Sequence, residues 1–190
     1  MAKFFGNLHL VLGVGLVAAI ALMLAFGPYV AVDINSVTRW LHLFFGITWI
    51  GLLYYFNFVQ IPTMPSVPAE LKPGVSKYIA PKALFFFRWA ALLTVITGLL
   101  IAVVSGYAHE ALTLQGTGGV LLIGIGMWIA IVMAANVWFI IWPNQKKALG
   151  IVEASAEAKA SAATTAMIAS RTNTLLSIPM LYTMVSANLG

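Results

Sequence analysis

Cysteine is absent from all 190 residues, and charge is scarce. Without cysteine the chain has no disulfide, thiolate metal site, iron–sulfur cluster or covalently attached c-type haem, because the last of these needs a C-x-x-C-H motif. Only 8% of the residues are charged, against about 25% in soluble domains, and 62% are hydrophobic. This composition predicts an integral membrane protein that forms a single domain over residues 1–190.

The formal net charge of +5 does not indicate nucleic-acid binding. No basic patch is interleaved with aromatic residues, and the lysines lie beside hydrophobic runs, where they set membrane topology. The sequence contains no Ser-His-Asp set, carboxylate pair, phosphate loop or metal-ligand cluster. Its five acids leave few candidates for general acid–base catalysis.

The hydrophobic runs predict an all-α, polytopic bundle of five transmembrane helices. The spans are expected at about residues 8–32, 39–60, 83–104, 119–142 and 171–188, with a surface helix at about 146–169. Asn35 or Ser36 is expected to cap the second span and Pro62 to end it. The first run is too long for a signal-peptide core, which has 7–15 apolar residues.

Basic residues predict the orientation of this bundle. Arg39 alone falls on one side of a five-span arrangement. The other side holds Lys3, Lys72, Lys77, Lys82, Arg88, Lys146, Lys147, Lys159 and Arg171. The positive-inside rule therefore places the N-terminus in the cytoplasm and the C-terminus outside.

A histidine interrupts the second run near its outer end. His42, Gly46 and Trp49 follow the i, i+4, i+7 spacing of one helix face. An ionisable residue inside a span is costly and suggests a functional site. Imidazole, a residue without a side chain and a flanking aromatic suit a helix that binds haem through His42 as the iron ligand. The alternative is a structural histidine that hydrogen-bonds a neighbouring helix.

Two further groups of residues are candidates for binding. His109, in a loop on the same side, and Met184 are candidates for a second haem ligand, although methionine in a span usually serves packing. Near the opposite face, arginine forks and side-chain amides form a candidate anion site of Asn57, Gln60, Arg88, Arg171 and Asn173. Arg88 would otherwise extend to lipid phosphate, and Arg171 would mark the membrane edge.

Several runs resemble the membrane domain at the N-terminus of bacterial cytochrome-c-linked urate oxidases (urate hydroxylases). The runs are Trp40-Leu-His-x6-Trp49-Ile-Gly51, Tyr55-Phe-Asn57-x2-Gln60-x-Pro62, Pro81-Lys-Ala-Leu84, Phe87-Arg-Trp89, Trp142-Pro-Asn-Gln-Lys146 and Ser170-Arg-Thr-Asn-Thr-Leu-Leu-Ser-Ile-Pro179. A fainter likeness, confined to the helix of His42, is to copper-resistance and protoporphyrinogen-oxidase-like membrane families. That likeness implies a b-type haem.

The resemblance implies a multi-pass redox protein of a bacterial inner (cytoplasmic or intracytoplasmic) membrane that binds haem b. Its partners would be the lipid bilayer and a membrane or periplasmic redox protein such as a cytochrome c. Urate is a planar anion that the inner cluster could hold, and haem propionates are another fit. Full-length members continue into a cytochrome c domain, so urate oxidation is expected here only when a partner cytochrome accepts the electrons. The alternative is a cofactor-free accessory subunit of a larger membrane complex.

Overall fold

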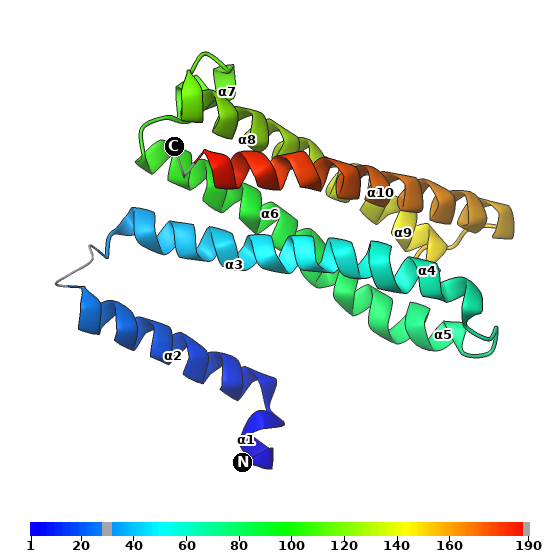
Figure 1. Ribbon diagram of the computed structural model, residues 1–190. Helices are drawn as coiled ribbons and strands as arrows, with labels where there is room; N and C mark the ends of the chain where they lie inside the picture. The colour runs from blue at the N-terminus through cyan, green and yellow to red at the C-terminus, as the bar shows by residue number, and fades with distance from the viewer. Residues whose placement is uncertain (28–31, 188–190) are drawn as a thin grey trace. The chain divides into compact units, whose positions relative to one another are not determined.

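The computed structural model describes residues 1–27 and 32–187, and this part of the chain is built from helices and short connections (Figure 1). The all-α class predicted from the hydrophobic runs is confirmed for these residues. Where the sequence predicts one domain, the contacts divide the chain into two compact units, Met1–Val37 and Thr38–Gly190. Each unit is described by itself.

The first unit contains α1 (Ala2–Phe5) and α2 (Leu8–Phe26). Asn7 caps α2, because its side-chain oxygen accepts a hydrogen bond from the Leu10 N–H at 3.2 Å. The helix is apolar all round, as membrane-spanning helices are. Residues 28–31 of the predicted first span lie outside the described part.

The turn before α3 (Ile34–Tyr54) is stabilised by a reciprocal pair of hydrogen bonds. The Asp33 carboxylate accepts from the Ser36 N–H at 2.8 Å, and the Ser36 hydroxyl accepts from the Asp33 N–H at 3.0 Å. These two bonds form a capping box. Of the two predicted capping residues, Ser36 takes part in it, and its partner is the Asp33 side chain. The hydrogen bond from Ser36 also holds the pKa of Asp33 below its usual value.

The second unit is a bundle of long helical rods (Figure 1). The first rod joins α3, the π-helical turn η1 (Tyr55–Gln60), α4 (Ile61–Thr63) and the 3₁₀ turn η2 (Met64–Ser66). The second joins α5 (Lys72–Gly74), the π-helical turn η3 (Val75–Ile79) and α6 (Ala80–Val104). After the short α7 (Ala108–Thr113), the third joins α8 (Gly118–Asn136), the π-helical turn η4 (Val137–Ile141) and α9 (Trp142–Ala148). The last is α10 (Ala156–Ser186).

Prolines near the ends of the rods do not stop them. Pro62, Pro81 and Pro143 each follow a π-helical turn, η1, η3 and η4, by two residues. A proline in a helix lacks an N–H and presses its ring against an earlier carbonyl. The wider i→i+5 turn moves the preceding carbonyls away, so the helix continues. The prediction that Pro62 ends the second span is therefore wrong, and the third helix begins at Lys72 rather than near residue 83.

The surface helix predicted at 146–169 is also not one helix. Its first residues complete α9, and a turn at Gly150 with φ of +71° ends that rod. A new helix begins after Ser155, whose side chain accepts from the Ala158 N–H. It runs without a break through residue 171 to Ser186, so the predicted surface helix and fifth span share α10.

Helix α10 contributes a small and polar face to the core. Its buried positions recur at helical spacing and are Ala162, Ala166, Ala169, Ser170, Asn173, Ser177, Met180 and Thr183. Gly126 of α8 packs against Thr183 so closely that a Cβ there would collide with the threonine side chain. Gly124 is packed in the same way against the backbone of Ala111 in α7. Both contacts agree with the close packing expected of small residues in membrane helices.

Four helical segments in the described residues are long and apolar enough to cross a membrane: Leu8–Phe26, Ile34–Ser66, Lys72–Val104 and Gly118–Ala148. The chain thus has the make-up of a membrane protein. Helix α10 is long enough but too polar to be counted with them, because Glu157, Lys159 and Arg171 and many Ser and Thr residues lower its hydropathy. The fifth span and the orientation stay predictions.

The second unit is electrically asymmetric along its length. Its end with α4, α5 and α9 carries Lys72, Lys77, Lys82, Lys146 and Lys147. The opposite end, with α7 and the start of α3, carries Arg39 (Figure 1). The first of these is called the Lys-rich end below. By the positive-inside rule, the predicted orientation has this end in the cytoplasm.

Cysteine labelling tests this orientation without background, because the native chain has no cysteine. Glu70 at the Lys-rich end and Thr113 on α7 are both exposed. In intact cells an impermeant maleimide is expected to label Thr113→Cys and to label Glu70→Cys only after the membrane is opened. Labelling of Glu70→Cys in sealed cells would reverse the orientation.

Candidate functional site

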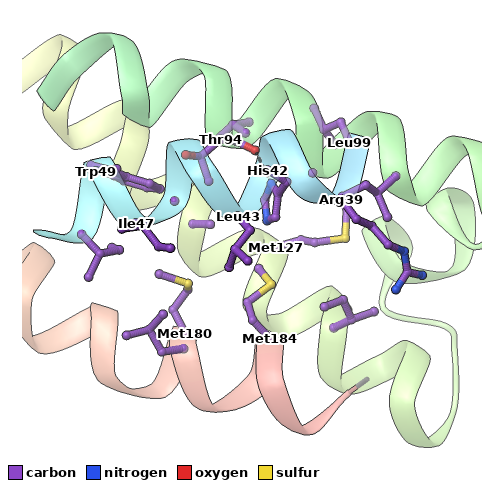
Figure 2. Close-up of a pocket in the computed structure, with 18 of the residues that line it drawn as sticks. Arg39, His42, Leu43, Ile47, Trp49, Thr94, Leu99, Met127, Met180 and Met184 are labelled. Carbon is purple, nitrogen blue, oxygen red and sulfur yellow. Dashed lines mark hydrogen bonds between the residues drawn. The ribbon is translucent and has the colours of Figure 1, made fainter. Parts of the chain in front are cut away.

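A cavity lies among α3, α6, α8 and α10 of the second unit. Helices α3 and α10 are joined near η1, where the Tyr54 and Ser177 hydroxyls are 2.9 Å apart and the Asn57 amide donates to the Ser170 hydroxyl at 2.8 Å. Toward Arg39 the two helices line opposite walls of this cavity of about 740 Å³, with α6 and α8 completing it (Figure 2). This volume lies within the usual range of small-molecule and cofactor sites, about 300–1,000 Å³.

His42 is fixed in this cavity by α6. Its Nδ1 lies 2.9 Å from the Thr94 carbonyl oxygen and 3.1 Å from the Thr97 hydroxyl. A carbonyl oxygen can only accept, so Nδ1 carries the proton and Nε2 keeps its lone pair. Among the described residues, Nε2 has no hydrogen-bond partner. Metal-ligating histidines generally show this arrangement, with one nitrogen donating to a carbonyl and the other available.

Gly98 makes room for the imidazole ring. A Cβ built on Gly98 would lie 2.9 Å from His42 Cε1 and 3.4 Å from Nδ1, which is closer than carbon atoms tolerate. The ring can therefore reach Thr94 only because residue 98 has no side chain. Sequence reasoning missed Gly98, and its only sequence signal is a glycine one turn after Thr94.

Three methionines line the walls away from α3. Met127 comes from α8, and Met180 and Met184 come from α10 (Figure 2). Of these, the sequence predicts only Met184 as a candidate ligand. Thioether sulfur is polarizable, and Met184 could serve as a second ligand if a haem were held by His42. The cavity thus brings His42 and Met184 together and adds two sulfur atoms that the sequence analysis did not select.

Polar groups at the end of the cavity near α7 are Arg39 and Tyr107. Tyr107 lies in the connection after α6, and burial raises the pKa of its phenol, whereas the positive charge of Arg39 acts to lower it. The two groups are therefore close enough to interact electrostatically. A carboxylate on a ligand in this cavity would find its cation in Arg39, which lies one turn before His42 on α3.

The remaining residues of the predicted haem site divide between the cavity and the surface. Gly46 and Trp49 line the cavity as their spacing from His42 predicts, and Trp49 is fully buried. His109 lies on α7, where a loop is predicted, and is exposed outside the cavity lining. His9 lies on α2 and is also exposed.

The amides of the predicted anion site bind protein groups. The Asn57 side-chain N–H group donates to the Leu53 carbonyl and the Ser170 hydroxyl. Asn173 donates to the Met133 carbonyl at 2.9 Å and accepts from Asn136 at 2.7 Å. These bonds fasten α10 to η1 on one side and α8 on the other.

The other members of the predicted anion site lie on different surfaces. Arg88 is half-buried on α6, and its guanidinium carbon lies 3.9 Å from the centre of the Trp142 ring. Arg171 is exposed on α10. Gln60 is half-buried, and its side-chain oxygen is enclosed without a partner in the described structure. Neither Arg88 nor Arg171 lines the His42 cavity.

Comparison with known proteins finds a family match in the C-terminal part of the chain. Residues 101–190 match the family described as urate oxidase N-terminal. The resemblance seen in the sequence is confirmed for this part, which contains the runs Trp142–Lys146 and Ser170–Pro179. The matched part also supplies Met127, Met180 and Met184 to the cavity, whereas His42 precedes it. No curated protein and no solved structure matches the chain.

Replacing Gly98 tests the position of His42. In Gly98→Ala the new methyl carbon would lie 2.9 Å from His42 Cε1. It should therefore push the imidazole ring away and lengthen the Nδ1–H···O bond to Thr94. The control is Gly51→Ala, since Gly51 lines the same cavity and a Cβ there meets no atom within 4 Å. NMR of isotopically labelled histidine should show loss of the strongly hydrogen-bonded Nδ1–H only in Gly98→Ala. Identical His42 resonances in both variants would contradict this geometry.

Proposed function

We propose that the second unit is a membrane redox module that binds a b-type haem in the cavity, with His42 Nε2 as iron ligand. The observation that supports this most directly is the orientation of His42, whose Nδ1 donates to Thr94 while Nε2 remains available in a cavity of cofactor size. A bound haem would supply reversible one-electron chemistry at its iron.

The cavity walls suit such a ligand in three respects. Leu43, Ile47 and Leu99 provide apolar surface for a flat, hydrophobic ring. Met127 and Met184 offer thioethers on the side away from α3. At the end near α7, Arg39 offers a guanidinium for propionate carboxylates. The arginine proposed for the propionates is therefore Arg39 rather than Arg88.

The protein's own contribution would be to hold His42 and exclude water. The Thr94 carbonyl and Gly98 together fix both the tautomer and the direction of the imidazole. Apolar side chains around the ligand keep the local dielectric low, which is a main determinant of a haem's reduction potential. Loss of the His42 imidazole would remove the proposed iron ligand. It would leave intact the contacts on the η1 side, where Tyr54 and Asn57 join α10.

Haem content tests this proposal. The purified wild-type protein should show a Soret band, and His42→Ala should lose nearly all of it while its helical circular dichroism is unchanged. His9→Ala and His109→Ala serve as matched controls, because both histidines are exposed and outside the cavity lining. Gly46→Leu should also lower the haem content by placing a side chain in the cavity. A wild-type protein without a Soret band would favour the cofactor-free accessory subunit.

Electron acceptance by a partner is the second part of the proposal, and it rests on the family match. No covalently attached haem can form in these 190 residues, because they hold no cysteine. We therefore propose a cytochrome c as the acceptor, with urate as the candidate donor. Urate loss by the purified protein should require added cytochrome c and should proceed together with its reduction. Equal urate loss with a soluble dye alone would contradict the need for a cytochrome.

A further inference from the structure

We propose that the bundle binds the phosphate group of an anionic phospholipid at the Lys-rich end, between Arg88 and Lys146. Both cations lie over the same indole ring, that of Trp142. The Arg88 guanidinium carbon lies 3.9 Å from the centre of the Trp142 ring, and Lys146 Nζ lies 5.7 Å from it. Arg88 also lies 5.3 Å from the centre of the Phe85 ring. The site is separate from the His42 cavity and independent of the proposed haem.

Among the described residues, no anion is paired with either of these two positive charges. The whole chain has five acids, and in the part that the structure describes none forms an ion pair with Arg88 or Lys146. Attraction to an aromatic face stabilises a cation but leaves its charge in place. Both side chains are half-buried against apolar surface, where repulsion between like charges is stronger than in water. An anion that contacts both groups would relieve this repulsion.

The types of side chain favour phosphate. Arginine presents a planar fork that pairs with two phosphate oxygens, and lysine adds a compact charge. They come from different rods, α6 and α9, which are linked by the Trp138 indole N–H donating to the Arg88 carbonyl at 3.1 Å. Basic pockets between helices at the cytoplasmic side of a membrane commonly bind lipid headgroups. The predicted orientation of the bundle has the Lys-rich end on that side.

Aromatic rings beside the cations favour a lipid over free phosphate. On α6, Phe85 and Trp89 are 6.3 Å apart, and Trp89 meets Trp138 of η4 edge-on at 5.4 Å. Phe85 and Trp89 are both exposed. An apolar aromatic surface next to a phosphate site can hold the first part of an acyl chain. Inorganic phosphate has no apolar part that could contact this surface.

Lipid retention tests the proposal. Wild-type protein and variants are placed in nanodiscs with equal amounts of phosphatidylglycerol and phosphatidylcholine, and the lipids that stay bound are measured by native mass spectrometry. Wild type should retain phosphatidylglycerol preferentially. Arg88→Gln and Lys146→Gln should each reduce that preference about tenfold, as expected when one charge-assisted hydrogen bond to the phosphate is lost. Arg88→Lys should fall between wild type and Arg88→Gln, because it keeps the charge but loses the fork.

The neighbouring lysine gives the matched control. Lys147 is exposed, and no aromatic contact links it to Trp142, so Lys147→Gln should keep the wild-type preference. Equal losses in Lys146→Gln and Lys147→Gln would reduce the effect to general surface charge and overturn the proposal. Displacement of the lipid by excess inorganic phosphate would overturn the assignment to a lipid. Lys146→Gln loses only the contact of Lys146 Nζ with the Trp142 ring at 5.7 Å, so it remains informative even if Arg88→Gln fails to fold.

Discussion

The hydrogen bonds of a few buried amides hold the bundle together and set the shape of its cavity. Asn173 is fully buried and ties α10 to α8 through the Met133 carbonyl and Asn136. Asn57 and Tyr54 tie the other side of α10 to the end of α3. Between apolar helices in lipid these bonds have no competition from water. The bonds that join α10 to α3 and η1 lie on the η1 side of Met180. Beyond it α3 and α10 line opposite walls of the cavity, while α10 stays packed on α8 through Thr183 and Gly126.

That separation explains why the candidate site lies where it does. Gly46, Trp49 and Met184 line the space between α3 and α10, while His42 turns to α6 for its hydrogen bond. A histidine held by a third helix does not need to bridge the gap between the other two. The imidazole is therefore fixed by Nδ1, and its other nitrogen would be available to hold an iron. Structural and ligand-binding roles of His42, treated as alternatives at the level of sequence, are compatible in this geometry.

The features that could be predicted from the sequence are those that depend on local periodicity and composition. Helical class, apolar segments and the common face of His42, Gly46 and Trp49 follow from spacing along one chain segment. Arg39, Gly98 and Met127 were missed because they meet His42 only through the packing of α3, α6 and α8. The anion site was predicted from depth in the membrane, and depth does not specify which side of its helix a residue occupies. Asn57, Arg88 and Arg171 lie toward the same end and still face different surroundings.

The buried amides also fix the register of the helices, although two of their unpartnered oxygens lower the stability of the folded state. Asn57 and Asn136 each direct their N–H groups at a backbone carbonyl, of Leu53 and Ala169, so neither amide can be turned over without facing oxygen to oxygen. Their side-chain oxygens are enclosed without a donor among the described residues. A buried acceptor without a partner costs roughly 1–3 kcal/mol. The donated bonds to Ser170 and Asn173 offset part of this cost, and they specify which residues of α10 meet η1 and α8. An apolar face on α10 would avoid the cost but could slide by a turn, and the cavity walls opposite His42 would slide with it.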